Sequence, residues 1–210
     1  MAAKLSELLA DLKEEEAITQ VEGMLAQGGD PLAIMAEARD GMRIVGERFA
    51  NGTYFIPDLI FSGEILKTIA GILEPHLKKA GGVQERKGKI VLGTVEGDIH
   101  DIGKDMVGFM LDAAGYEIID LGVDVPAQGF VDAVKSSGAK VVALSGFLTL
   151  AFGNMKKTVE ALQSAGLRDG LKVMIGGGQV DEDIVNHTGA DAFGTDANAA
   201  VVLANQWIGG

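Results

Sequence analysis

Apolar residues recur at helical spacing through the first 80 residues of the chain. One stripe steps by three and four positions: Met35, Ala38, Met42, Val45 and Phe49. Asp30 before Pro31 supplies an N-cap and a proline at the first helical position, and residues 51–57 separate this helix from the next. A second stripe consists of Leu59, Leu66, Ala70, Leu73 and Leu77. With shorter amphipathic segments before residue 28, the spacing predicts an antiparallel four-helix bundle over residues 1–80.

The pattern changes after a polar, glycine-containing stretch that we interpret as a linker, residues 81–89. Short β-branched runs then alternate with helix-like stretches. The runs are KIVLGTV, YEIIDLG, KVVALSG, LKVMIGG and ADAFGT, and the helix-like stretches lie near 104–114, 127–137, 152–165, 180–187 and 197–207. Continuous apolar runs are typical of strands buried on both faces, and the alternation implies right-handed crossovers. Residues 90–210 therefore predict an α/β domain, a flavodoxin-like, doubly wound sheet of five parallel strands.

Composition narrows the classes of partner. Eighteen Lys and Arg against thirty Asp and Glu give a net charge of −12, which works against binding to nucleic acid or to an anionic membrane. The absence of cysteine excludes disulfides, thiolate zinc sites and cysteine nucleophiles. The N-terminus lacks the apolar run of a signal peptide, and no stretch is apolar for long enough to span a membrane. We expect a cytoplasmic protein that binds small ligands and other proteins.

The loop after the first predicted strand, EGDIHDIG, places His100 between Asp98 and Asp101. Ligands of doubly wound sheets bind at the carboxyl ends of the strands, where the strand order reverses. A protein-only zinc site needs three or four ligands, and the other histidines, His76 and His187, fall in distant elements. A lone histidine can still be an axial ligand when a macrocycle supplies the other donors, with a neighbouring carboxylate accepting its second ring N–H. The alternative is a solvated loop histidine.

Two other ligand classes fit this edge poorly. A phosphate site would have glycines and hydroxyls in the first loop, but this loop carries acidic residues and no G-x-G-x-x-G. A phosphoacceptor receiver domain needs an aspartate after the third strand and a lysine after the fifth. This chain has Ser145 and the stretch GTDAN at those places.

Three motifs at fixed separations resemble one known family. Asp98-Ile-His100-Asp-Ile-Gly103 is followed after 41 residues by Ser145-Gly-Phe147, and after 28 more by Gly176-Gly177. This is similar to the D-x-H-x-x-G, S-x-L and G-G pattern of the cobalamin-binding domains of methionine synthase and of the small corrinoid proteins of anaerobic methyltransferase systems. In that family a helical cap domain precedes the cobalamin domain, which matches residues 1–80.

The resemblance implies a cofactor and a set of contacts. The cofactor is cobalamin or a related corrinoid, bound base-off, with His100 replacing the cofactor's own base as lower axial ligand to cobalt. The residues implied to contact the cofactor are Gly97, Asp98, Ile99, Asp101, Gly103, Ser145, Thr149, Gly176, Gly177 and Ala197. In the cap, the stretches GERF and FIP imply that Phe49 and Ile56 cover the upper corrin face.

Two positions depart from the family pattern. Phe147 stands where the motif has leucine, and its bulk is expected to narrow the slot for the cofactor's nucleotide tail. Ala151 stands where methionine synthase has the serine that completes a His-Asp-Ser relay, so we expect the relay to stop at Asp98 or to end on water.

The implied function is that of a methyl carrier, non-catalytic by itself. Co(I) accepts a methyl group from a substrate-specific methyltransferase, and a second methyltransferase removes it from methyl-Co(III) to tetrahydrofolate or a thiol. A reductive activator is a further expected partner. The donor is an aromatic methyl ether, a methylamine, a betaine or methanol. The alternative is the small subunit of an adenosylcobalamin-dependent mutase, which normally lacks a helical cap. A cobalamin-dependent regulator would need a basic DNA-binding helix, which the sequence does not contain.

Overall fold

The computed structural model describes residues 3–79, 86–178 and 180–209. The chain divides into two compact units, residues 1–85 and 86–210. No helix in the described part of the chain is long and apolar enough to cross a membrane.

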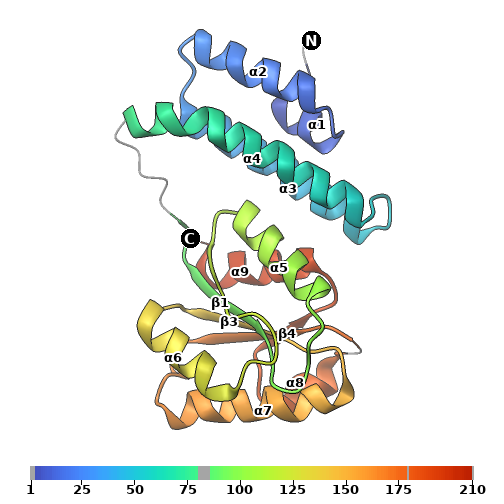
Figure 1. Cartoon of the computed structure of the whole chain (residues 1–210), viewed down its shortest axis with the longest axis vertical. Helices are drawn as coiled ribbons and strands as arrows, with labels where there is room; N and C mark the ends of the chain where they lie inside the picture. The colour runs from blue at the N-terminus through green and yellow to red at the C-terminus, as the bar shows by residue number, and fades with distance from the viewer. Residues whose placement is uncertain (1–2, 80–85, 179, 210) are drawn as a thin grey trace. The chain divides into compact units, whose positions relative to one another are not determined.

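The first unit contains four helices within residues 3–79 (Figure 1). They are α1 (Leu5–Ala10), α2 (Glu14–Ala26), α3 (Pro31–Ala50) and α4 (Ile56–Lys79). The predicted start of α3 is confirmed, because the side chain of Asp30 accepts a hydrogen bond from the N–H of Leu32 at 3.0 Å and Pro31 follows it. Both α1 and α4 pack against α3. Apolar residues of α3 that are buried in this bundle are Ile34, Met35, Ala38, Met42 and Val45.

The buried face of α4 differs from the predicted stripe at two residues, each replaced by the residue before it. Leu59, Leu73 and Leu77 are buried as expected, but Leu66 and Ala70 are only half-buried. The fully buried positions between them are Ile65 and Ile69. Large apolar residues stand at adjacent positions here, and both sets satisfy helical spacing, so periodicity does not distinguish the two faces.

The second unit is a five-stranded sheet in which every strand is parallel, with the order β2-β1-β3-β4-β5. The strands are β1 (Lys89–Thr94), β2 (Glu117–Asp120), β3 (Val141–Ser145), β4 (Lys172–Gly176) and β5 (Ala192–Gly194). The helices are α5 (Ile102–Ala113), α6 (Ala127–Ser137), α7 (Thr149–Ser164), α8 (Glu182–Thr188) and α9 (Ala197–Ile208). The predicted flavodoxin-like order is confirmed.

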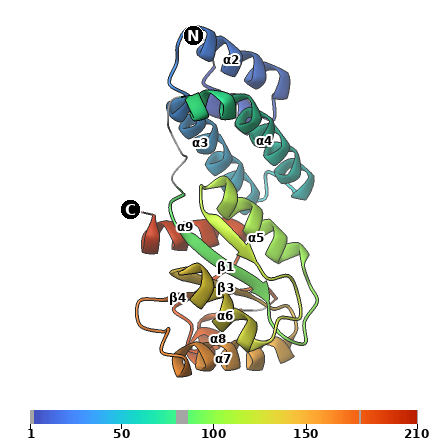
Figure 2. The same ribbon diagram turned by 60° about the vertical axis from the view of Figure 1, so that its left-hand side comes forward.

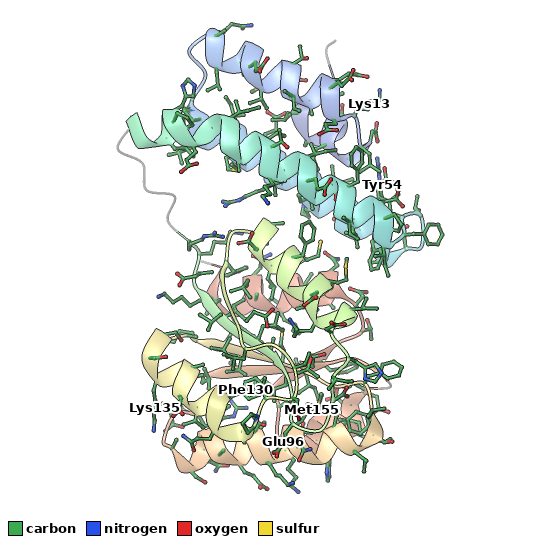
Figure 3. All side chains as sticks on the ribbon, viewed as in Figure 1. Lys13, Tyr54, Glu96, Phe130, Lys135 and Met155 are labelled. Carbon is green, nitrogen blue, oxygen red and sulfur yellow. The ribbon has the colours of Figure 1, made fainter. Side chains whose placement is uncertain are left out.

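The sheet is the middle layer of three. Helices α5 and α9 cover one face, and α6, α7 and α8 cover the other (Figures 1 and 2). Alternate residues of β1 accordingly belong to different cores. Ile90 and Leu92 pack with Leu111, under α5 and α9. Val91 packs in the second core with Phe130 and Met155, which Figure 3 labels. The two-sided burial explains why the strands read as continuous apolar runs.

The predicted linker, residues 81–89, falls partly outside the described residues, because 81–85 are not among them. The remainder is attached to the second unit. The guanidinium of Arg86 forms an ion pair with Asp112 at 2.7 Å and donates to the carbonyl of Tyr116 at 2.8 Å. The backbone N–H of Lys87 donates to the carbonyl of Gly115, and Lys89 is the first residue of β1.

Candidate functional site

The carboxyl ends of the strands bring the predicted site loops together. Thr94 at the end of β1 pairs with Ser145 of β3, Ser145 pairs with Gly176 of β4, and Gly176 pairs with Gly194 of β5. These residues form a row along one edge of the sheet. The strand order reverses at β1, so the loop that carries His100 lies at the topological switch point.

Local hydrogen bonds shape the loop between β1 and α5. Gly97 has a left-handed φ of +80°, which turns the chain after the strand. The hydroxyl of Thr94, which is completely buried, donates to the carbonyl of His100 at 3.0 Å. The backbone N–H of His100 donates to Oδ1 of Asp98 at 3.0 Å. The loop therefore closes on itself and presents residues 99 and 100 at the surface.

The His100 imidazole is held by Asp98. Its Nδ1 lies 2.6 Å from Oδ1 of Asp98, whose side chain is fully buried, whereas half of the His100 side chain is exposed. An ionised carboxylate only accepts, so Nδ1 carries the proton in the neutral ring and Nε2 presents its lone pair. A carboxylate that fixes the tautomer and orientation of a histidine is typical of metal-ligating histidines.

Asp98 is ionised because its environment supplies donors. Burial alone would raise the pKa of this carboxyl group, but the N–H of Leu148, the backbone and ring N–H groups of His100, and the N–H of Phe147 lower the pKa to about 2. Its Oδ2 accepts from Phe147 N at 2.6 Å and from Leu148 N at 3.0 Å. Since Leu148 is the N-cap residue of α7, the carboxylate also lies at the positive end of that helix.

Phe147 contacts both residues of the Asp98–His100 pair, Asp98 through its backbone N–H and His100 through its ring. Its ring lies beside the His100 imidazole, with centroids 4.7 Å apart and an angle of 32° between the planes. The predicted narrowing of a tail slot by Phe147 is not tested by this contact, which instead places the ring against the ligand candidate. Ala151, the other departure, is buried in the first turn of α7. The two oxygens of Asp98 already accept four hydrogen bonds without a hydroxyl at position 151.

Large apolar side chains are exposed in the loops around His100 and in the first turns of α5 and α7. They are Ile99, Ile102, Phe147, Leu148 and Leu150. Leu150 is 82% exposed and Ile99 is 72% exposed. Exposing apolar side chains of this size together to water is unfavourable, and a ligand that covers them would remove this cost. Gly103 lies in the first turn of α5, where glycine weakens a helix. No protein atom lies within 4 Å of the place where its Cβ would be, so the protein itself does not require a glycine there. The surface fits a flat, largely apolar ring approaching Nε2.

The glycines after β4 make a close backbone contact with the loop after β3. Gly178 has a φ of +54°, and a Cβ there would lie 2.5 Å from the carbonyl oxygen of Phe147. At Gly177, with a φ of +101°, a Cβ would lie 2.8 Å from the carbonyl oxygen of Gly146. Only glycine fits either position. The two glycines therefore let the backbone after β4 lie directly against residues 146 and 147 of the loop after β3.

The remaining predicted contact residues have different environments. Ser145 is half-buried at the end of β3, Thr149 is exposed at the start of α7, and Ala197 is buried at the start of α9. Asp101 is exposed at the start of α5, and its side chain makes no capping bond. Of the two aspartates that flank His100, Asp98 contacts the ring nitrogen Nδ1.

In the first unit, the two predicted cap residues stand at the end of the bundle where α3 leads into α4. Phe49 is half-buried and Ile56 is 42% exposed. Phe55, Ile60 and Phe61 beside them are exposed as well. An apolar surface therefore exists on this unit.

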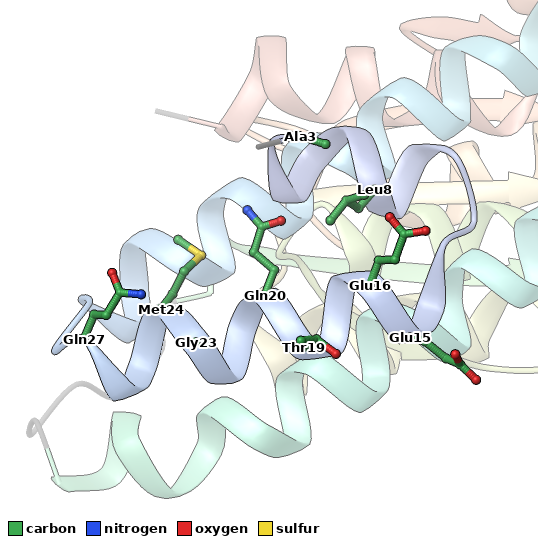
Figure 4. Close-up of a pocket in the computed structure, with 9 residues that line it drawn as sticks. All are labelled: Ala3, Leu8, Glu15, Glu16, Thr19, Gln20, Gly23, Met24 and Gln27. Atoms are coloured by element: carbon green, nitrogen blue, oxygen red, sulfur yellow. The ribbon is translucent and has the colours of Figure 1, made fainter. Parts of the chain in front are cut away.

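A hollow of about 770 Å³ lies elsewhere on the first unit, between α1 and α2 (Figure 4). It is lined by Ala3, Leu8, Glu15, Glu16, Thr19, Gln20, Gly23, Met24 and Gln27. This lining offers no imidazole. Within the residues that the structure describes, no three His, Cys, Asp or Glu side chains are grouped to hold a metal ion.

Sequence reasoning missed three residues that hold the His100 loop or its helix. They are Thr94, Asp124 and Lys104. The ammonium of Lys104 is buried in the first turn of α5 and pairs with Asp105 at 2.6 Å and with Asp120, at the end of β2, at 2.5 Å. A lysine one position after the glycine of D-x-H-x-x-G is visible in the sequence, but its partner at the end of the neighbouring strand is not.

Comparisons with known proteins show the family to which the chain belongs. Two family models, each described as a B12 binding domain, match residues 88–204 and residues 1–74. A corrinoid protein of Desulfitobacterium hafniense strain Y51 is 45% identical over 170 residues, which are 80% of this chain and 79% of that protein. The trimethylamine corrinoid protein of Methanosarcina barkeri is 38% identical over 200 residues, with 95% and 92% covered.

Two solved structures extend the similarity to three dimensions. A cobalamin-binding protein from Desulfitobacterium hafniense DCB-2 is 43% identical with a TM-score of 0.84, and the alignment covers 97% of both chains. The methanol:cobalamin methyltransferase complex MtaBC from Methanosarcina barkeri contains a chain that is 27% identical, with a TM-score of 0.80 and coverage of 99% of this chain and 79% of that one. The resemblance predicted from the three motifs is confirmed.

Proposed function

Because the chain belongs to the family of B12-binding corrinoid proteins, we propose that it carries methyl groups on a bound corrinoid between two methyltransferases. The observation that carries the proposal is His100, whose Nδ1 is bonded to buried Asp98 and whose Nε2 is left to act as a ligand at the edge of the sheet. The relatives and neighbours named above, a trimethylamine corrinoid protein and a methanol methyltransferase complex, support a role in methyl transfer.

The residues present fit a corrinoid. His100 would be the lower axial ligand, and Asp98 would keep its ring oriented and its Nε2 basic. The exposed apolar side chains of Ile99, Ile102 and Leu150 would lie under the ring, and the displaced tail would pass the Gly176–Gly177 pair at the end of β4. When bound, the corrinoid supplies cobalt, the atom that carries the methyl group.

The chain's own contribution is coordination and shielding. Phe49 and Ile56 of the first unit would cover the upper face of the ring, a role that the exposed apolar side chains beside them support. The partners are a substrate-specific methyltransferase, a second methyltransferase that acts on tetrahydrofolate or a thiol, and a reductive activator. The donor belongs to the class of small methylated amines, methanol, betaines or aromatic methyl ethers.

Spectroscopy of the reconstituted protein tests the proposal. The chain loaded with hydroxocobalamin and reduced to Co(II) should give an electron paramagnetic resonance spectrum split by one protein nitrogen. Labelling the protein with [15N]histidine should change that splitting from a triplet to a doublet. His100→Ala should lose it, whereas the control His187→Ala, an exposed histidine of α8 in the same unit, should keep it. Failure to bind cobalamin, or an unchanged spectrum in His100→Ala, contradicts the proposal.

A second experiment separates a methyl carrier from a mutase subunit. The reduced, cobalamin-loaded protein should take up about one methyl group per cobalt from methyl iodide. It should then release the methyl group to a thiol or to tetrahydrofolate when the matching methyltransferase is added. Failure to accept methyl, together with activity alongside a mutase large subunit, would favour the alternative.

A further inference from the structure

The loop that follows β2 runs beside the loop that carries His100. The N–H of Thr94 donates to the carbonyl of Gly122 at 2.9 Å, and the N–H of Val125 donates to the carbonyl of Thr94 at 3.0 Å. Val95 and Val125 form an isolated parallel bridge. Asp124 is thereby placed directly against residues 96–98.

Asp124 makes two hydrogen bonds to this neighbouring loop. Its Oδ1 accepts from the N–H of Gly97 at 2.7 Å, and its own N–H donates to the carbonyl of Asp98 at 2.9 Å. The two bonds enclose the Gly97–Asp98 backbone. Since Asp98 in turn binds both the backbone and the ring of His100, the contacts run from Asp124 through Asp98 to the metal-ligand candidate.

The backbone of Asp124 is in an unfavourable conformation. Its φ is +54°, and in the described part of the chain only Leu12 shares a positive φ among residues other than glycine. Glycine adopts this conformation at no steric cost, as Gly122 does two positions earlier with a φ of +83°. Aspartate and asparagine tolerate it better than other residues, but still at some cost. A turn alone would therefore favour glycine, and the aspartate is explained by its acceptor oxygen.

The other side of the loop is held by α7. The side-chain amide of Asn154 donates to the carbonyl of Glu96 at 2.6 Å, and Figure 3 shows Glu96 beside that helix. The segment between Glu96 and Asp98 is thus fixed at both ends, by Asn154 and by Asp124. A loop fixed in this way presents its ligand without having to be ordered by the cofactor.

We propose that Asp124 is a positioning residue for His100, which holds the His100 loop in its ligand-presenting conformation before any cofactor binds. The inference rests on the proposed function only in taking His100 as the ligand. Its structural content, the dependence of the His100 loop on the Asp124 carboxylate, holds for the cofactor-free chain and can be measured there.

Three substitutions of Asp124 distinguish the role of its acceptor oxygen from the role of its left-handed backbone in the turn. Asp124→Asn keeps a side-chain oxygen and tolerates the left-handed backbone. Asp124→Gly keeps the backbone without strain but removes the acceptor, and Asp124→Ala removes the acceptor and retains the strain. Because Asp124→Gly relieves strain, it should remain folded, and circular dichroism and thermal unfolding check this for all three variants.

Amide hydrogen exchange of the cofactor-free chain is the first measurement. In Asp124→Gly and Asp124→Ala, the amides of Gly97 and His100 should exchange about five- to tenfold faster than in the wild type, the change expected when about one hydrogen bond is lost. In Asp124→Asn both amides should exchange at close to the wild-type rate. Faster exchange at Gly97 with no change at His100 would overturn the proposal, because the lost bond would then be local.

The nitrogen splitting of Co(II) in the cobalamin-loaded variants is the second measurement. The fraction of protein with this splitting should fall in Asp124→Gly and recover in Asp124→Asn. If glycine equals aspartate in both measurements, the residue serves only the turn and the inference fails. If the wild type itself shows no nitrogen ligation, the proposed function fails, while hydrogen exchange still decides whether Asp124 orders the loop.

Discussion

The imidazole of His100 lies against the phenyl ring of Phe147, with 4.7 Å between the ring centroids and 32° between the planes. The backbone N–H of the same phenylalanine donates to Oδ2 of Asp98, and Oδ1 of Asp98 contacts the imidazole. Phe147 therefore touches both members of the Asp98–His100 pair. Its ring is 57% exposed, so this contact, and not burial in the core, explains an aromatic residue at this position.

Replacing Phe147 should remove one contact of the His100 imidazole without unfolding the chain. An aromatic pair contributes about 0.5–1.5 kcal/mol. We expect Phe147→Ala to change the free energy of unfolding by about 1 kcal/mol or less, and to shift the His100 ring protons in the nuclear magnetic resonance spectrum of the cofactor-free chain, because the ring current of Phe147 is lost. The control Leu150→Ala replaces an exposed apolar residue in the first turn of α7 and should leave those resonances in place. Unmoved His100 resonances in Phe147→Ala would contradict the contact.

The ionisation of Asp98 should appear in the acid stability of the chain. Its pKa is about 2 in the folded state against an ordinary value of 3.8. Since the folded pKa is the lower one, ionised Asp98 stabilises the fold fully above about pH 4, and the contribution is lost as the pH falls towards 2. The difference corresponds to about 2 kcal/mol.

We therefore expect Asp98→Asn to unfold at lower urea concentration than the wild type at pH 7, and the difference to shrink between pH 4 and pH 2. Urea unfolding at several pH values measures it. The matched control is Asp101→Asn, three residues past the start of the same motif and exposed, which should change the free energy of unfolding by less than about 0.5 kcal/mol at any of these pH values. A constant difference across the acid range would exclude the assigned role of the carboxylate.

The close contact of Gly178 with the carbonyl of Phe147 predicts a strong effect of a single methyl group. Gly178→Ala combines a left-handed backbone with a Cβ 2.5 Å from a backbone oxygen, and should destabilise the chain by about 2–4 kcal/mol. Gly153→Ala is the control, because a Cβ there meets nothing within 4 Å and lies inside α7, so it should stabilise by up to about 1 kcal/mol. Thermal unfolding of both variants measures the contrast, and equal melting temperatures would be inconsistent with the contact.

The pairing of Lys104 predicts an asymmetry between two substitutions. Burial lowers the pKa of Lys104, but hydrogen bonds and charge interactions with Asp105 and Asp120 outweigh it and raise the pKa. Asp120→Asn leaves a buried ammonium with one carboxylate fewer and should cost about 1–3 kcal/mol. Lys104→Met removes the buried charge itself and leaves two carboxylates that water already reaches, so it should cost less. Chemical unfolding of the two variants gives the order, and the reverse order would refute this account.

The sequence predicts the fold because the determining patterns are local. The apolar runs beginning at Ile90, Val141 and Val173 mark strands buried on both faces, and the Asp30–Pro31 pair marks a helix start. Where two apolar residues are adjacent, as at Ile65 and Leu66, only tertiary packing decides which one is buried. The predicted α4 stripe is wrong at Leu66 and Ala70 for that reason.

In the candidate site, too, contacts within one loop are predictable from the sequence and contacts between distant segments are not. His100 and Asp98 stand two positions apart in one loop, and their interaction follows from that spacing. Asp124 and Phe147 approach the loop from other segments, and no local pattern indicates that their side chains or backbone reach it. The exposed ring of Phe147 is predictable as a departure from a motif, but its position against His100 depends on the path of the chain after β3.

The bonds from the N–H groups of Phe147 and Leu148 to the carboxylate of Asp98 join segments 49 and 50 residues apart in the chain. During synthesis from the N-terminus, β1 and the His100 loop emerge well before β3 and the start of α7. Until those later residues pair with β1, a carboxylate that ends up buried has only its own loop as a source of donors. We therefore expect the orientation of His100 to be acquired late in folding, when the third strand joins the sheet, and a chain truncated before residue 147 to carry the D-x-H-x-x-G motif without its geometry.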